Sequence, residues 1–510
     1  MHEKKTRNFQ ILTYGCQMNI YDSDRLGALL RGRGWEATEN REEADFIFVN
    51  TCSIREKAAR RVIGHLKRLR EMKLKNPALL LGVGGCVAEQ EGKKLLDEVP
   101  WLNLVVGPSR LDEIPEIMET LSCSDRPVVL SGQGSGTEGP AAPIIPMLDK
   151  TDALSPTPGL SAPPRGGEAE DSKEVSPKRA GGSTNPSQAL LTEEKLEKSG
   201  SRRILSLPPA RETRPAPMSS FLTIMSGCDN YCAYCVVPYL RGPERSRPME
   251  EVIAEARSLV ARGSLEITLL GQNVNSYGRP GHRDGRDFAA LLTEVSAIEG
   301  LKRLRFTTSH PKDFPDGLVA LFGSLPNLCE HLHLPLQAGS DAVLANMGRR
   351  YTKEKYLALV SSLRKVRPEL ALSTDVIVGF PGETEEQFLE TVSLLETVRF
   401  DSIYSFKYSD RPMTKANLMP GKIPEEEKAE RLSRLQAVQK AVTLEIHQNL
   451  VGLEKEVLVE GFGRKPGQLS GRTRDMKIIN FDGPANLLGQ LVKVTVTEAW
   501  PVSLLGKMAT

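Results

Sequence analysis

The chain has 510 residues and a formal net charge of +2, with 39% hydrophobic and 26% charged residues. This length leaves room for about three domains of ~100–200 residues each. No apolar run approaches the roughly 18 residues of a membrane helix, and MHEKKTRNFQ contains no signal-peptide core, so we expect a cytoplasmic protein without a membrane segment. Because the net charge is small, nucleic-acid binding would depend on local basic patches. Eight cysteines without an export signal indicate a reducing compartment, where thiols bind metals more often than they pair.

The first 124 residues alternate strand-like and helical segments, which is the pattern of an α/β domain with a parallel sheet. Strands are predicted at 9–14, 46–50 and 78–83, and Asp22 or Ser23 is the expected N-cap of the first helix. Cys16, Cys52 and Cys86 each follow one of these strands, at the turn into a helix.

These three cysteines are expected to converge, because the carboxyl ends of parallel strands share one edge of the sheet. We therefore predict a three-cysteine iron–sulfur site with one open iron. The alternative is three unrelated buried cysteines, since cysteine is among the most buried residue types.

Two further segments stand out by composition. Between Arg55 and Lys75, nine Lys or Arg residues and two Glu residues predict one basic helix, which would either attract a polyanion or be a solvated face. Residues 131–215 contain 12 of the 34 prolines and no aromatic residue or cysteine. Such a segment cannot bury enough apolar surface to offset its ordering entropy, so we expect a disordered linker with at most a short helix near 188–198.

Strand–helix alternation resumes from Met218. Helices are predicted at 249–262 and 424–451, and six strands are predicted at 221–225, 266–270, 303–308, 331–334, 372–378 and 402–408. Six βα units fit a partial barrel whose functional face is formed by the carboxyl ends of its strands.

The first of these strands leads into GCDNYCAYC, where Cys228, Cys232 and Cys235 form a C-x3-C-x2-C run. Three thiolates this close together can bind three irons of a cubane cluster and leave the fourth open. Electron-transfer clusters use four cysteines and structural zinc sites fill their coordination shell, so three cysteines indicate chemistry at the metal. The alternatives are an incomplete zinc site or thiols without a metal role. Cys123 and Cys329 fit neither pattern and are expected to be ordinary thiols.

The last 60 residues change to a period of two, with Val492, Val494 and Val496 alternating with polar residues. This pattern predicts a small β-barrel. Its loops carry Arg464, Lys465, Arg472, Arg474 and Lys477, with Phe462 and Phe481 nearby. Basic groups beside aromatic rings suit phosphates and unstacked bases, with a solvated basic rim as the alternative.

The C-x3-C-x2-C run, with Tyr234 before its third cysteine, resembles the radical S-adenosylmethionine (SAM) superfamily. More specifically, the chain resembles the methylthiotransferase family, and within it the MiaB-type branch. The motifs that carry this resemblance are YGCQMNIYDSD, VNTCSIREKA, GVGGCVAEQ, GCDNYCAYCVVPYLRGPERSRP, LLGQNVNSYG, HLPLQAGSDAVLANMGR, STDVIVGFPGETEEQF and GRTRDMKIINFDG. The resemblance implies an α/β multidomain protein: an N-terminal methylthiotransferase domain (8–125), a radical SAM core (216–447) and a C-terminal TRAM domain that binds RNA (450–510).

The resemblance also implies roles for individual residues. An auxiliary 4Fe–4S cluster would be held by Cys16, Cys52 and Cys86, and the SAM-binding cluster by Cys228, Cys232 and Cys235. Contacts to SAM are implied for Gln272, Asn273, Gly379 and Glu383. Weaker site candidates, placed by motif, are Arg241, Arg247, His333 and Gln337. The sequence departs from the family pattern at QAGS (337–340) and at Met413, where a glycine is usual.

The implied reaction is methylthiolation of C2 of N6-isopentenyl(dimethylallyl)adenosine at position 37 of tRNA, with one SAM as methyl donor and another as radical source. The implied partners are tRNA and an electron donor such as flavodoxin or ferredoxin, with a monomeric chain. One alternative is a sister enzyme that acts on threonylcarbamoyladenosine in tRNA or on a ribosomal-protein aspartate. Two others are a radical SAM enzyme whose auxiliary cluster only relays electrons and a non-catalytic RNA-binding iron–sulfur protein.

Overall fold

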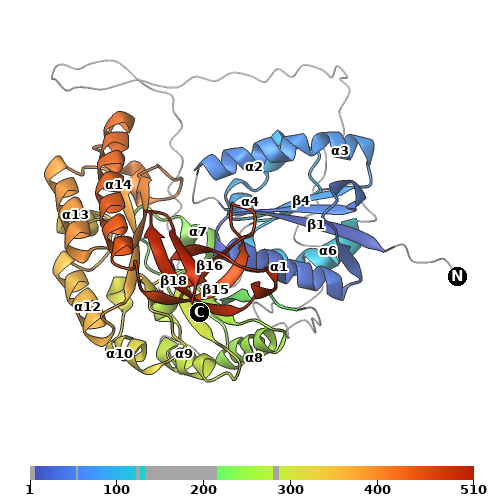
Figure 1. Cartoon of the computed structure of the whole chain (residues 1–510). Coiled ribbons are helices and arrows are strands. Elements are labelled where there is room, and N and C mark those ends of the chain that lie inside the picture. Colours follow the sequence, from blue (N-terminus) through green and yellow to red (C-terminus); the bar gives the residue numbers. More distant parts are fainter. Residues whose placement is uncertain (1–5, 53–55, 122–126, 132–214, 279–285, 510) are drawn as a thin grey trace, which may run out of the picture.

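The computed structural model describes residues 6–52, 56–121, 127–131, 215–278 and 286–509. Apart from its first and last residues, the predicted linker lies outside this described part, as do Arg55 and Cys123. Figure 1 shows a layered N-terminal unit beside a larger barrel-like unit, with the C-terminal strands lying against the latter. No described helix has the length and apolar content of a membrane span.

The N-terminal unit contains one six-stranded parallel sheet, in the order β2-β1-β3-β4-β5-β6. Its strands are β1 (Arg7–Tyr14), β2 (Trp35–Ala37), β3 (Phe46–Thr51), β4 (Leu80–Gly85), β5 (Leu104–Val106) and β6 (Val128–Leu130). The three predicted strands and their parallel arrangement are confirmed. Three more strands were not predicted, because β2, β5 and β6 have only three residues each, too few for a periodic pattern to show.

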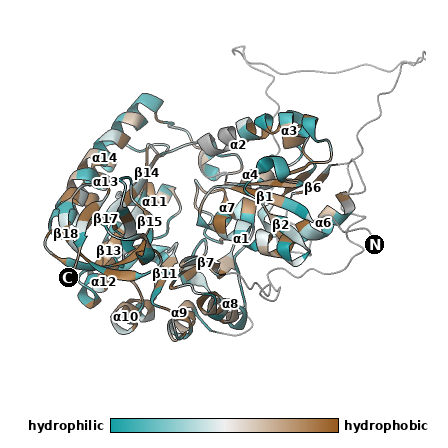
Figure 2. Ribbon diagram, turned by 45° about the vertical axis from the view of Figure 1, so that its right-hand side comes forward, coloured by the Kyte–Doolittle hydropathy of each residue, from teal (hydrophilic) through white to brown (hydrophobic). Residues whose placement is uncertain are grey.

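Helices cover both faces of this sheet. Helices α1 (Gln17–Gly32) and α6 (Ile114–Leu121) pack against one face, where Phe46 and Phe48 point, and α2 (Glu56–Arg68) and α5 (Lys94–Glu98) cover the other. Strand β3 is therefore buried along its whole length, as its continuous apolar run requires in a parallel sheet. In Figure 2 the strands inside these layers are mainly hydrophobic, whereas the helices carry both colours.

Two local predictions in this unit were wrong. The N-cap of α1 is Cys16 rather than Asp22 or Ser23, because the Asn19 side chain accepts from the Cys16 amide and starts the helix earlier. The predicted single basic helix is two helices, α2 and α3 (Arg70–Lys75). They are separated at Leu69, whose amide donates to the carbonyls of both His65 and Leu66.

The central unit contains the six predicted strands, which confirms the partial barrel. They are β7 (Ser219–Thr223), β10 (Glu266–Leu270), β11 (Arg303–Thr307), β12 (His331–His333), β13 (Ala371–Val378) and β14 (Ser402–Lys407). They form two parallel sheets, β7-β10-β11 and β12-β13-β14, which a bridge between Leu304 and Leu328 connects. The main helices outside them are α8 (Met249–Ala261), α9 (Phe288–Ser296), α10 (Asp316–Ser324), α12 (Lys353–Val366), α13 (Glu385–Val398) and α14 (Glu425–Gln448).

The C-terminal unit is a closed barrel in the order β15-β16-β17-β19-β18, as predicted. Its strands are β15 (Glu454–Phe462), β16 (Gln468–Thr473), β17 (Ile478–Asp482), β18 (Leu491–Ala499) and β19 (Leu504–Met508). Val494 and Val496 lie in its core, in agreement with their alternation with polar residues.

Met413, which stands where a glycine is usual, has a φ of +67° and an exposed side chain. A residue with a Cβ is strained in this region, whereas glycine is not. We expect Met413→Gly to stabilise the protein by about 0.5–1 kcal/mol, the difference between relieved strain and the larger backbone entropy of glycine. A thermal unfolding midpoint above that of the unsubstituted protein would confirm this, and Met413→Ala, which keeps the Cβ, serves as the control.

Candidate active site and cluster-binding cysteines

The structure brings Cys16, Cys52 and Cys86 together at the carboxyl edge of the N-terminal sheet. The Cys52 thiol lies between the other two and is hydrogen-bonded to both. These hydrogen bonds lower the pKa of Cys16 to about 5 and that of Cys86 to about 6, whereas they and burial raise the pKa of Cys52. Helix α4 (Cys86–Glu91) begins with the third cysteine. The convergence predicted from three strand ends is therefore present.

Two buried asparagines that the sequence analysis missed fix the turns that carry these thiols. Asn19 donates to the Asn50 side chain (3.0 Å) and to the carbonyl of Thr51 (3.1 Å), and Asn50 donates back to the Asn19 carbonyl (3.0 Å). Gly85 closes the arrangement with a φ of +86°, and a Cβ there would lie 2.1 Å from the Thr51 carbonyl oxygen. Asn19 and Asn50 were findable, since each lies within three residues of a site cysteine.

The second cysteine group lies in a loop closed by two short paired strands, β8 (Met225–Ser226) and β9 (Arg245–Ser246). Burial raises the pKa of Cys228 and, to about 12, that of Cys235, with the charge of Cys232 contributing to both. Gly227 has a φ of +82°, and a Cβ there would lie 2.0 Å from the Pro243 carbonyl oxygen. Three thiols thus share one enclosed loop next to the carboxyl ends of the barrel strands.

Helix α7 (Val237–Arg241), within this loop and directly after its third cysteine, connects the two cysteine groups. Val236 and Leu240 pack against Cys86. Arg241 forms an ion pair with Asp22 of α1 (3.3 Å), and its hydrogen bond to Cys86 helps to lower the pKa of that thiol. The two thiol groups therefore belong to one continuous site, and Arg241 lies at the first of them.

Arg247, by contrast, joins the two domains through polar contacts. It pairs with Glu255 (2.7 Å) and donates to the Tyr21 hydroxyl (3.1 Å) and to the Thr223 carbonyl (2.7 Å). Its two Nη groups thus have protein partners, whereas its buried Nε has none.

Buried polar atoms without a protein partner gather after β10 and β11, at the carboxyl ends of these strands. These atoms are Gln272 Oε1, Asn273 Oδ1, both amide atoms of Asn275 and Ser309 Oγ. Asn273 also donates to Asp313 (2.9 Å), which fixes its side chain. Buried polar groups are normally satisfied. A polar ligand such as the methionine group of SAM therefore fits here.

The other sequence candidates have protein partners. The Glu383 carboxylate accepts from the Gly379 amide (2.6 Å) and from Arg431 of α14 (2.9 Å), so it stabilises the turn after β13. His333 contacts Ser373 (3.0 Å) and Asp375 (3.4 Å), and the Gln337 backbone pairs with β13. These contacts place all four residues beside the barrel strands, and both of these contacts of the Glu383 carboxylate are to the same oxygen, Oε2.

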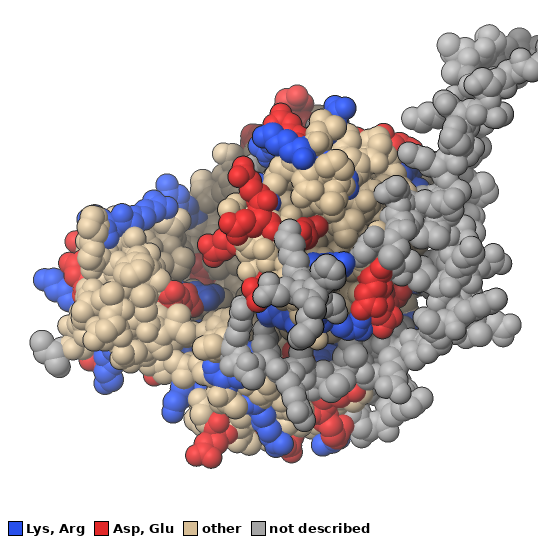
Figure 3. All heavy atoms as spheres, turned by 90° about the vertical axis from the view of Figure 1, so that its right-hand side faces the viewer, with Lys and Arg blue, Asp and Glu red and all other residues tan. Residues whose placement is uncertain are grey.

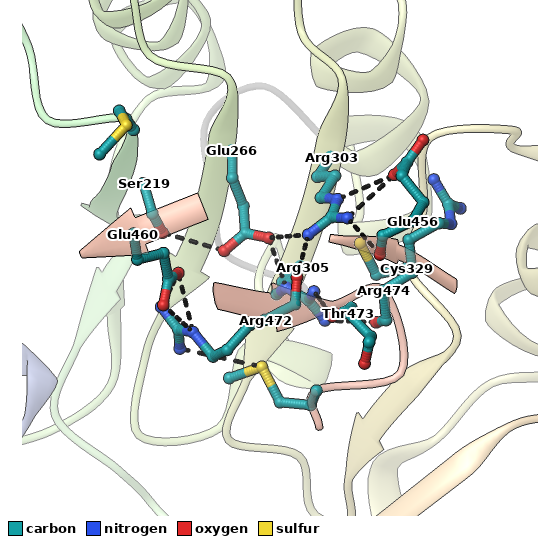
Figure 4. Close-up of polar contacts among 12 residues, drawn as sticks. Ser219, Glu266, Arg303, Arg305, Cys329, Glu456, Glu460, Arg472, Thr473 and Arg474 are labelled. Carbon is teal, nitrogen blue, oxygen red and sulfur yellow. Dashed lines mark hydrogen bonds and ion pairs between the residues drawn. The ribbon is translucent and has the colours of Figure 1, made fainter. Parts of the chain in front are cut away.

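Several basic residues of the C-terminal barrel attach it to the core instead of facing a loop surface. Arg474 pairs with Glu330 (2.8 Å) and Lys477 with Asp401 (2.8 Å). In return, Arg305 of β11 donates to the carbonyls of Thr473 (3.0 Å) and Arg474 (2.7 Å), as Figure 4 shows.

The prediction that Arg472, Arg474, Lys477 and Phe481 bind RNA from exposed loops is therefore corrected. Arg472 pairs with Glu460 within the barrel (2.6 Å), and Phe481 is completely buried in its core. Sequence alone did not reveal that the barrel docks on the core through the turn between β16 and β17.

Exposed basic and aromatic groups remain at the end of β15 and on the loop between β15 and β16. Phe462 is 66% exposed, and Arg464 and Lys465 next to it are exposed as well. On the face seen in Figure 3, basic and acidic side chains are interspersed. The β15–β16 loop is thus the part of the predicted RNA-binding surface that the structure leaves free.

Among the described residues, no group of three or more His, Cys, Asp or Glu side chains is placed to hold a single metal ion. A cubane cluster has a different requirement, since each thiolate binds its own iron. Three thiols on neighbouring turns, beside a buried arginine, fit such a cluster.

Three family models match separate parts of the chain. They are the uncharacterized protein family UPF0004 at residues 8–107, the radical SAM superfamily at 222–395 and the TRAM domain at 448–509. The tRNA-2-methylthio-N(6)-dimethylallyladenosine synthase of Geobacter metallireducens is 44% identical over 501 residues, which cover 98% of each chain. That of Moorella thermoacetica is 41% identical over 508 residues, which cover 99% of each.

The chain belongs to the tRNA-2-methylthio-N(6)-dimethylallyladenosine synthase family. It is therefore a radical SAM enzyme, as the resemblance implied. Among solved structures, the radical SAM methyltransferase TsrM of Kitasatospora setae, with cobalamin and a [4Fe-4S] cluster bound, has a TM-score of 0.50 at 15% identity, covering 91% of this chain and 77% of that one. This likeness shows that the two chains share a fold.

Proposed function

We propose that this protein attaches a methylthio group to C2 of N6-dimethylallyladenosine at position 37 of tRNA. The observation that carries the proposal is the pair of three-thiol groups in adjoining domains, joined through α7 and Arg241. Relatives at 41–44% identity over nearly the whole chain bear the name of this activity. We propose domain limits of 8–125, 216–447 and 450–510.

Each thiol group would hold one 4Fe–4S cluster with an open iron. Cys228, Cys232 and Cys235 would bind the cluster that takes SAM, and Cys16, Cys52 and Cys86 the auxiliary cluster. When bound, these groups supply a radical from one SAM, a methyl group from a second and a site for the sulfur.

The protein's own residues bind, orient and enclose these groups. Gln272 and Asn273, whose buried carbonyl oxygens lack protein partners, would accept hydrogen bonds from the methionine end of SAM. Gly379 and Glu383 would shape the adenine side, since the Glu383 carboxylate already accepts from the Gly379 amide (2.6 Å). Arg241 would neutralise part of the negative charge at the auxiliary site.

The partners that we propose are tRNA and a low-potential electron donor such as flavodoxin or ferredoxin, acting on a monomer in the cytoplasm. The exposed Phe462, Arg464 and Lys465 offer a stacking surface and two cations to the RNA. The target adenine must leave its stack to be modified.

The experiment that tests this function uses reconstituted enzyme, SAM and a low-potential reductant. The substrates are tRNA with and without the N6-dimethylallyl group, threonylcarbamoylated tRNA and a ribosomal protein. We expect mass spectrometry of the nucleosides to show a methylthio product only from the dimethylallylated tRNA. Product from threonylcarbamoylated tRNA, or from a ribosomal protein, would instead assign the chain to a sister enzyme. Absence of 5'-deoxyadenosine in every reaction would contradict the enzymatic function.

A further inference from the structure

One buried arginine of the core differs from the others. Among the residues that the structure describes, five arginines are at most 4% exposed: Arg247, Arg303, Arg305, Arg349 and Arg431. Four of them have a carboxylate partner within 3.0 Å. The pairs are Arg247–Glu255, Arg303–Glu456, Arg305–Glu266 and Arg431–Glu383. No carboxylate in the described part of the chain forms an ion pair with Arg349.

The partners of Arg349 are a thiol and neutral oxygens. Its Nη1 donates to Cys232 Sγ (3.6 Å) and to the Tyr234 hydroxyl (3.5 Å), and its Nη2 donates to the Pro335 carbonyl (2.9 Å). The guanidinium also lies over the ring of Tyr351, 5.3 Å from the centroid. The residue therefore reaches the second cysteine group from the segment between β12 and α12.

A buried cation without a counter-charge is costly, whereas a paired one is tolerated. Among the partners of Arg349, Cys232 is the one that carries a full negative charge when it binds iron. A negatively charged metal centre bound to Cys232 would therefore compensate the buried positive charge of Arg349.

We propose that Arg349 is a positioning residue that holds the Cys232 sulfur and raises the reduction potential of the cluster at this site. The inference rests on the proposed function, because it takes Cys232 as a cluster ligand. The reduction adds one electron from the external donor and neither forms nor breaks a bond in the protein. A cation that donates to a ligand sulfur stabilises the reduced form, since this form carries one more negative charge.

The test is a redox titration of the reconstituted protein. The reduced cluster is monitored by electron paramagnetic resonance, through the signal that changes when SAM is added. In Arg349→Gln we expect the ratio of reduced to oxidised cluster at a fixed potential to fall about tenfold, which is a shift of about 59 mV to more negative potential for one electron. Arg349→Lys keeps the charge but loses the fork of donors, so its shift is expected to be smaller.

Arg303→Gln is the matched control, because Arg303 is an equally buried arginine whose partner is a carboxylate, Glu456. Its potential is expected to remain unchanged. An unchanged potential in both Arg349 variants would overturn the inference, as would loss of the cluster from both variants, since Arg349 would then only hold the loop. If the unsubstituted protein gave no SAM-sensitive signal, the proposed function itself would fail.

Discussion

Replacement of Cys52 by alanine is expected to abolish methylthio transfer while 5'-deoxyadenosine formation from SAM remains measurable. Cys52 lies between Cys16 and Cys86 and is hydrogen-bonded to both, so its loss removes the centre of the first thiol group. The second group is held separately, by the β8–β9 loop and Arg349. Both products are measured in one anaerobic reaction, by chromatography for the nucleoside and mass spectrometry for the tRNA.

Two matched variants define how this result is read. Cys232→Ala should abolish both products, because radical formation precedes transfer. Cys329→Ala should retain both, since Cys329 is a buried thiol whose pKa of about 11 reflects burial, and it belongs to neither group. Methylthio product from the Cys52 variant would contradict the auxiliary-cluster assignment.

Replacement of Arg305 by glutamine is expected to destabilise the docking of the C-terminal barrel strongly. Arg305 pairs with buried Glu266 (2.9 Å) and donates to two carbonyls of the turn that follows β16 (Figure 4). Removing one partner of a buried ion pair costs about 3–5 kcal/mol. The low end of this range is expected, because Glu266 keeps a longer contact with Arg303 (3.9 Å). Hydrogen exchange of the β16–β17 turn is expected to increase, and the thermal midpoint to fall.

The double variant Glu266→Gln/Arg305→Gln should recover part of this loss, because no buried charge remains unpaired. The pair also predicts a pH dependence. Although burial opposes it, Arg305 lowers the pKa of Glu266, so the stabilisation is present above the unfolded value of about 4.3 and is lost as the pH falls below it. Unchanged exchange in the single variant would show that the barrel docks by other contacts.

Much of this protein could be predicted because its signals are local. The cysteine spacing at 228–235 lies within one loop, and the period of two at Val492, Val494 and Val496 lies within one strand. Convergence of Cys16, Cys52 and Cys86 was also predictable, since a parallel sheet returns every strand end to the same edge. In each case the pattern is set by neighbours in sequence or by a rule of topology.

What sequence reasoning missed depends on partners far along the chain. Arg349 ends a motif that was recognised, but its sulfur partner is 117 residues away. Likewise, Arg474 was expected to face RNA because its charge is visible in the sequence, whereas Glu330, which neutralises it, is 144 residues distant.

The sequence by itself determined the order of the three domains, the two groups of three thiols and the family. The tertiary structure alone decided which Lys and Arg side chains are available to bind a ligand and which form ion pairs that hold the domains together. The physical reason is that a charge has a role only in relation to what surrounds it. Burial and the nearest carboxylate determine that role, and folding brings both from distant parts of the chain.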